Sequence, residues 1–138
     1  MSGPRLEDLV VGAALPEREH VPDSIQLFLY NAALWNAHRI HFEESYATGV
    51  EGYRDLVVPG PLMGDWLTQC VLEWLGDAGR LVRVEYSNRK AAYRGDRLRV
   101  GGRIERIDRA ARRVELALWV RDDADEIVTP GSAVVELA

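Results

Sequence analysis

The sequence predicts an α+β domain in which one long helix packs against a sheet. In residues 61–76 the apolar side chains recur in pairs one helical turn apart, which builds a single wide apolar stripe. Several later segments alternate apolar and polar residues, as strands with one buried face do. The helical stripe carries the indoles of Trp66 and Trp74 and needs a large apolar surface, which a sheet provides.

The ends of the long helix are marked in the sequence. Pro61 suits the first helical position, where its missing N–H costs nothing, and Gly60 before it allows a close approach of other groups to the backbone. Gly76 and Gly79 mark the end of the helix. The N-terminus of this helix is therefore expected to present free amides and a partial positive charge to a developing anion.

The remaining elements are predicted from shorter patterns. Residues 81–86, 97–107, 114–120 and 127–137 are expected to be strands of one sheet. Pro130 and Gly131 in the last of them favour an edge strand or a bulge. A short helical turn is expected over residues 43–48.

The first part of the chain is expected to hold a short strand and a helix. Residues 15–21 form the strand, on which His20 has charged neighbours and is predicted to be solvated. The helix begins near Asp23, and Asp23 with Gln26 matches a capping box. The pattern fades at Trp35. The predicted buried face of the helix consists of Ile25, Phe28, Leu29 and Ala32.

Composition limits the classes of function. The 138 residues are expected to form a single domain, 1–138, and the net charge of -5 argues against a general nucleic-acid binder. The one cysteine, Cys70, lies on the helical stripe and is interpreted as a small core residue. No apolar run reaches the roughly 20 residues of a bilayer span, and no signal peptide is recognised. A cytoplasmic protein with no membrane partner is expected.

Residues 36–44 are the most unusual stretch, because they hold two of the three histidines, His38 and His41, with Asn36 before them and two carboxylates after. Three interpretations are open. The first is a polar loop whose histidines hydrogen-bond locally. The second is a metal site, which lacks a third ligand of matching spacing. The third is an acid–base site, because imidazole titrates near neutral pH and can both accept and donate a proton.

Three motifs in order resemble those of one family. They are Asn-Ala-His-Arg-Ile-His followed by Tyr-Ala in residues 36–47, Val-Val-Pro-Gly-Pro-Leu in residues 57–62, and Tyr-Arg-Gly-Asp-Arg-Leu in residues 93–98. Together they resemble the MaoC-like dehydratases, the R-specific enoyl-CoA hydratases of the hot-dog superfamily. The resemblance implies a single hot-dog fold, in which a curved antiparallel sheet wraps around the central helix at about 61–76. A cone-shaped α+β domain is the alternative fold.

The resemblance also implies roles for individual residues. The catalytic histidine of the family falls on His41, and its catalytic aspartate falls on Asn36, which is a departure because an amide cannot accept a proton as a carboxylate does. Asn36 can still orient a water, and His38 is the candidate second titrating group. The amide of Gly60 is expected to stabilise an oxyanion. Pro59 replaces a histidine that usually precedes this glycine.

The sequence is most similar to a subgroup with an Asn-x-His-(Arg/Lys)-Ile-His pattern, which includes mesaconyl-thioester hydratases and mitochondrial-type acyl-thioester dehydratases. Several members carry the motif in the second of two hot-dog units, whereas this chain has length for one. The resemblance therefore implies a homodimer, or a heteromer with a second hot-dog subunit.

The function that the resemblance implies is reversible hydration of a trans-2-enoyl thioester in fatty acid or steroid side-chain metabolism. Coenzyme A would be part of the substrate, and no separate cofactor or metal is expected. Arg39, Arg89 and Lys90 are candidate ligands of its phosphates, with solvated basic side chains as the alternative. Two other functions stay open. One is a hot-dog thioesterase, with Asp65 as its candidate carboxylate, and the other is a non-catalytic subunit that completes the pocket of a partner.

Overall fold

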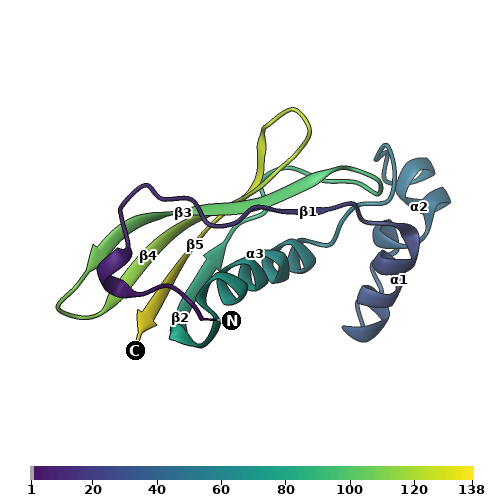
Figure 1. Ribbon diagram of the computed structural model, residues 1–138. Helices are drawn as coiled ribbons and strands as arrows, with labels where there is room; N and C mark the ends of the chain where they lie inside the picture. Colours follow the sequence, from purple (N-terminus) through teal and green to yellow (C-terminus); the bar gives the residue numbers. More distant parts are fainter. Residues whose placement is uncertain (1) are drawn as a thin grey trace.

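The computed structural model describes residues 2–138, and its long helix lies along one face of a five-stranded antiparallel sheet (Figure 1). The strands follow the order β1-β3-β4-β5-β2. Their bounds are β1 Arg18–His20, β2 Gly79–Tyr86, β3 Leu98–Asp108, β4 Arg113–Arg121 and β5 Ile127–Leu137. The four predicted strands of the C-terminal half are therefore confirmed, and the curled sheet around a central helix is the arrangement expected of a hot-dog fold.

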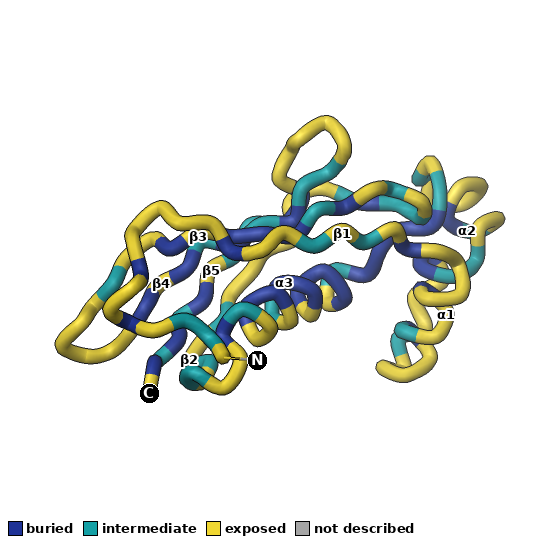
Figure 2. Tube along the Cα trace, in the orientation of Figure 1, coloured by how far each residue is buried: buried dark blue, intermediate teal, exposed yellow. Residues whose placement is uncertain are grey.

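The central helix, α3, spans Gly60–Leu75 and begins one residue earlier than predicted. Its apolar stripe is buried against the sheet, with Trp66 and Leu67 at its centre and Cys70 one turn later, which confirms Cys70 as a core residue. Gly64 allows a close approach of β2 to α3, because a Cβ atom there would lie 2.2 Å from the ring of Tyr86 at the end of β2. Figure 2 shows the buried face of α3 turned toward the sheet.

The smaller helices lie at the end of the sheet where α3 begins (Figure 1). They are α1 Ser24–Ala33, the 3-10 turn η2 Arg39–His41 and α2 Glu44–Gly49. The turns η1 Leu6–Asp8 and η3 Gly76–Ala78 lie before β1 and after α3. The predicted cap of α1 is confirmed, since the Asp23 carboxylate accepts from the Gln26 amide at 2.8 Å.

The predicted buried face of α1 is wrong. Ile25, Phe28, Leu29 and Ala32 are all exposed, and Leu27 and Asn31 are the buried residues of this helix. The reason is that α1 projects away from the sheet (Figure 1), so the sheet does not cover these side chains. Trp35, just beyond the helix, is 94% exposed.

His20 on β1 is also placed differently from the prediction of a solvated side chain. Its ring stacks on the Trp66 indole with centroids 4.3 Å apart and planes 9° apart, and its Nε2 atom is buried without a hydrogen-bond partner among residues 2–138. Burial, reinforced by the nearby Arg18, lowers the pKa of His20 below its ordinary value of 6.5. A neutral imidazole used as a packing surface explains the difference.

The last strand is interior rather than an edge, because β5 pairs with both β4 and β2. Pro130 is tolerated there since the pairing of β2 ends with Tyr86 opposite Gly131, one residue before Pro130 is reached. A register shift does occur in the pairing of β4 with β5, between Val120 and Arg121. The open edges of the sheet are β1 and β2.

Candidate active site

The histidine-containing stretch folds back between α1 and α2 as a tight turn. The side-chain oxygen of Asn36 accepts a hydrogen bond of 3.0 Å from the backbone N–H of His38. The backbone N–H of Asn36 donates to the backbone carbonyl of Asn31 at 2.9 Å. These bonds fix the entry to η2, which buries Ile40 and His41. The amide of Val57 then donates to the Ile40 carbonyl at 2.9 Å, which joins this turn to the segment that leads into α3.

His41 is held in one tautomer. Its Nδ1 atom lies 2.7 Å from the carbonyl oxygen of Val57, and only an Nδ1–H can bond there, so Nε2 keeps its lone pair. The residue is 7% exposed. Burial lowers the pKa of His41 below 6.5, and the nearby His38 lowers it further, although the bond to Val57 acts in the opposite direction. His41 is therefore a neutral base at pH 7.

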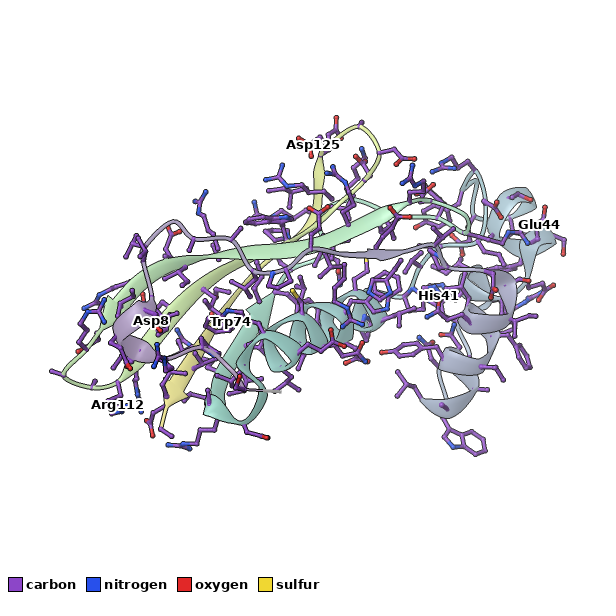
Figure 3. The ribbon with its side chains drawn as sticks, in the orientation of Figure 1. Asp8, His41, Glu44, Trp74, Arg112 and Asp125 are labelled. Carbon is purple, nitrogen blue, oxygen red and sulfur yellow. The ribbon has the colours of Figure 1, made fainter. Side chains whose placement is uncertain are left out.

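The N-terminus of α3 faces the same space as His41. A cavity of about 250 Å³ is lined by His41, Val57, Val58, Gly60, Met63, Asn88, Arg89, Lys90 and Ala91. The Gly60 amide donates to no other group among residues 2–138, as expected at the first residue of a helix. Figure 3 places the His41 side chain near this end of α3. A base and a free backbone donor therefore share one cavity.

The other predicted catalytic residues lie near this cavity but do not line it. His38 is exposed, and its ring meets that of His41 edge to face with centroids 5.4 Å apart. Asn36 is half-buried and lines a separate apolar cavity of about 370 Å³, with Phe28, Asn31, Ala32, Trp35, Ala37 and Phe42. Asn36 thus contacts the backbone of the histidine turn rather than the space in front of His41.

The predicted phosphate ligands differ in what surrounds them. Arg89 and Lys90 both line the cavity of His41. The Lys90 ammonium pairs with Asp122 at 2.9 Å and with Glu126, which raise its pKa above the ordinary value. Arg89 has no carboxylate partner among residues 2–138, and its Nε donates to the Ser87 hydroxyl at 3.4 Å.

Arg39 lies outside the cavity and is already engaged. It pairs with Glu43 through two hydrogen bonds of 2.7 and 2.9 Å, and its guanidinium lies over the Tyr46 ring, 4.2 Å from the centroid. Its charge is largely compensated within the chain.

Asp65, the candidate carboxylate of a thioesterase, is exposed on α3 and does not line the cavity of His41. It accepts a hydrogen bond of 2.8 Å from the hydroxyl of Tyr30 on α1. This bond raises the pKa of Tyr30 together with the burial of its ring, which is the larger cause. Asp65 thus connects α1 to α3.

One residue of the cavity, Asn88, was missed by the sequence interpretation. It lies two residues beyond β2 in the polar run 87–90, where an asparagine gives no signal by itself. Its position is determined by the approach of β2 to the start of α3, a contact between segments that only the fold brings together.

Among residues 2–138, no three His, Cys, Asp or Glu side chains come together as a metal site would need. No described helix combines the length and the low polarity that crossing a bilayer requires.

Two curated relatives are similar to short parts of the chain. A 52-residue segment, 36% of the chain, is 44% identical to the mitochondrial hydroxyacyl-thioester dehydratase type 2 of Schizosaccharomyces pombe. A 46-residue segment, 33% of the chain, is 52% identical to the mesaconyl-C(4)-CoA hydratase of Chloroflexus aurantiacus. The matched parts cover only 17% and 16% of these longer proteins.

Solved structures show the fold over nearly the whole chain. The (R)-hydratase from A. caviae involved in PHA biosynthesis superimposes with a TM-score of 0.87 at 15% identity, over 96% of this chain and 99% of that one. A chain of the ChsH1-ChsH2 complex from Mycobacterium tuberculosis superimposes with a TM-score of 0.83 at 16% identity, over 94% and 98%.

A sequence profile of hydroxyacyl-thioester dehydratase type 2 matches residues 12–94, which is more than half of the chain and includes both His41 and Gly60. The match ends before β3. The likeness of β3, β4 and β5 to known proteins therefore comes from the superimposed structures. On this match and its hot-dog fold, the chain belongs to the hydroxyacyl-thioester dehydratase type 2 family.

Proposed function

We propose that this protein catalyses the reversible hydration of a trans-2-enoyl thioester to the 3-hydroxyacyl thioester, as a hydro-lyase. The observation that carries the proposal is that the free Nε2 of His41 and the unbonded amide of Gly60 belong to one cavity. The names of the relatives, a hydroxyacyl-thioester dehydratase and a mesaconyl-CoA hydratase, support the same reaction class.

In the proposed mechanism, Nε2 of His41 removes a proton from a water molecule as its oxygen bonds to the β-carbon of the substrate. The electron pair of the double bond moves toward the thioester carbonyl and produces an enolate. The Gly60 amide donates to the enolate oxygen, and the dipole of α3 favours the negative charge there. The imidazolium then returns a proton to the α-carbon, and dehydration follows the same steps in reverse.

Asn36 and His38 are proposed to position rather than to transfer protons. An amide cannot accept the proton of water, and the side-chain oxygen of Asn36 is bound to the His38 backbone, which shapes the turn that carries His41. His38 touches the His41 ring and influences its charge. Both residues are thus proposed to act on the base through the turn that carries it, because neither lines the cavity in front of His41.

The thioester is proposed to be coenzyme A-linked, with its phosphates near the basic rim of the cavity. Arg89 is the best placed cation, because it lines the cavity and has no carboxylate partner among residues 2–138. Lys90 shares its charge with Asp122 and Glu126, and Arg39 is paired with Glu43 away from the cavity, so both are weaker candidates. Coenzyme A would be part of the substrate, with no separate cofactor.

The partner is proposed to be another hot-dog unit, either a second copy or a different subunit. Strand β2 is an open edge, and Val82 and Tyr86 on it are exposed. The neighbour of similar fold from Mycobacterium tuberculosis was solved as the two-protein ChsH1-ChsH2 complex. The cytoplasmic location stays a prediction, since the Schizosaccharomyces pombe relative is named mitochondrial.

The test compares the hydration of crotonyl-CoA by wild type and by His41→Ala. The rate is measured as the loss of the absorbance of the enoyl thioester. Loss of a general base typically lowers the rate by about 10²–10⁴-fold. His20→Phe is the matched control, because it removes a histidine that packs on Trp66 outside the cavity. Equal rates for wild type and His41→Ala would contradict the proposal.

The same assay separates the two alternatives. A thioesterase would release free thiol from crotonyl-CoA, which a thiol reagent detects, and the engagement of Asp65 with Tyr30 makes this the less supported function. A non-catalytic subunit would be inactive alone and would support hydration only with its partner, at a rate that does not depend on His41. The amide at Asn36 is the observation that favours this second alternative.

A further inference from the structure

Asn88 lies at the rim of the candidate cavity with its amide oriented by the sheet. Its side-chain oxygen accepts from the hydroxyl of Thr129 on β5 at 3.0 Å. Thr129 is fully buried, and its hydroxyl also lies 3.5 Å from the sulfur of Met63 on α3. Because the Asn88 oxygen is used by a buried hydroxyl, the nitrogen end of the amide is the part that turns away from the sheet.

That nitrogen lies against Gly60. A Cβ atom built on Gly60 would be 2.0 Å from Nδ2 of Asn88, so the amide nitrogen fills the space that any side chain at this position would need. Nδ2 donates to no other group among residues 2–138, and neither does the backbone amide of Gly60. Two uncommitted N–H donors from different parts of the chain therefore lie next to each other, on two residues that line the cavity of His41.

We propose that Asn88 is a catalytic residue whose Nδ2 donates to the enolate oxygen beside the Gly60 amide, and that Thr129 is its positioning residue. The assignment rests on the proposed hydratase function. An enolate oxygen accepts more than one hydrogen bond, and donors fixed in advance stabilise charge that develops during the reaction. A neutral amide also stays a donor at every pH, whereas the cations at the rim can pair with carboxylates, as Lys90 does.

The first test is steady-state hydration of crotonyl-CoA. Loss of one donor from an oxyanion site lowers kcat by about 10²–10³-fold, so Asn88→Ala should show this fall in kcat with a smaller change in KM. Thr129→Val should also lower kcat, because it removes the hydroxyl that orients Asn88. Thr129→Ser keeps the hydroxyl and should retain most of the wild-type kcat. Gln69→Ala removes an exposed amide from the far part of α3 and should match wild type.

A double-mutant cycle tests the contact itself. Gly60→Ala keeps the backbone N–H but forces Asn88 out of its place, so its loss of kcat should resemble that of Asn88→Ala. The double variant should then be little slower than either single variant, because both changes remove the same donor. If the fold-decrease in kcat of the double variant equals the product of the two single decreases, Asn88 acts independently of position 60. That result would overturn the assignment.

A spectroscopic measurement separates this assignment from the function on which it rests. In the His41→Ala background the carbonyl stretch of bound crotonyl-CoA can be followed by infrared difference spectroscopy without turnover. Adding Asn88→Ala should shift the band to higher frequency, as expected when a carbonyl loses a donor.

One outcome is that the wild type hydrates crotonyl-CoA but Asn88→Ala changes neither kcat nor the carbonyl band. This outcome would overturn the role of Asn88 and leave the hydratase function in place. Failure of the wild type, tested with its partner, to hydrate crotonyl-CoA or other enoyl thioesters would remove the hydratase function and this assignment with it.

Discussion

The Nδ1–H of His41 donates to the carbonyl oxygen of Val57 at 2.7 Å, across 16 positions of sequence. The same segment continues through Pro59 into α3, so the group that fixes the tautomer of the base is attached to the helix that presents the Gly60 amide. His41 and the Gly60 amide are thus positioned by one stretch of backbone, and a displacement of one displaces the other.

The pH dependence of hydration should reflect the lowered pKa of His41. The base acts only when neutral, so kcat/KM should be constant near pH 7 and fall on the acid side, through a pKa below 6.5. His38→Ala should move this limb toward higher pH, because His38 disfavours the charged form of His41. The measurement is a kcat/KM profile for wild type, His38→Ala and His20→Phe, and the last should leave the limb in place. An acid limb above pH 6.5 would contradict the prediction.

Stability should decrease on acidification because of His20. Its pKa is lowered in the folded state, so between that value and 6.5 the unfolded chain binds more protons. The free energy of unfolding should therefore fall as the pH drops below 6.5. His20→Phe keeps a ring against Trp66 and removes the titrating group.

Urea unfolding at pH 7.5 and at pH 5.5 measures this difference. The loss on acidification should be smaller for His20→Phe than for wild type, and smaller again for His20→Phe/His41→Phe, since His41 shifts in the same direction. An undiminished loss in both variants would show that other groups control the acid response.

Association of the chain should depend on the open edge of β2. Val82 lies at the register shift between Leu81 and Arg83 and is exposed. If two copies pair along this edge, light scattering should give twice the 15.5 kDa chain mass, and Val82→Arg should reduce it toward one chain by placing cations on both sides of the interface. Ile25→Arg on α1 is the comparison, as it changes an exposed apolar residue away from β2. If the mass stays at that of two chains in Val82→Arg but falls to one chain in Ile25→Arg, the interface lies on α1.

The elements that were predicted correctly have periodic sequence patterns. The stripe of α3 and the alternation in β2, β3, β4 and β5 are local properties of the chain, because the same residues must face the core wherever the partner element lies. The cap of α1 was likewise visible, since Asp23 and Gln26 are three residues apart and interact directly.

The errors arose where distant contacts decide the outcome. An apolar face predicts that something covers it, but Phe28 and Leu29 of α1 are more than half exposed. His20 was judged from its charged neighbours, whereas its environment is set by Trp66 on another element. The shared cavity of His41 and Gly60 was anticipated from the family resemblance, and Asn88 could not be recognised before the fold placed it against Gly60.

The contact between Gly64 and Tyr86 sets the height of α3 above the sheet near the site. A methyl group at position 64 would overlap the Tyr86 ring, so either this ring or the start of α3 would have to move, and Gly60 lies one turn earlier on the same helix. The absence of a side chain at position 64 therefore leaves room for the Tyr86 ring beside the helix start, four residues from the amide of Gly60.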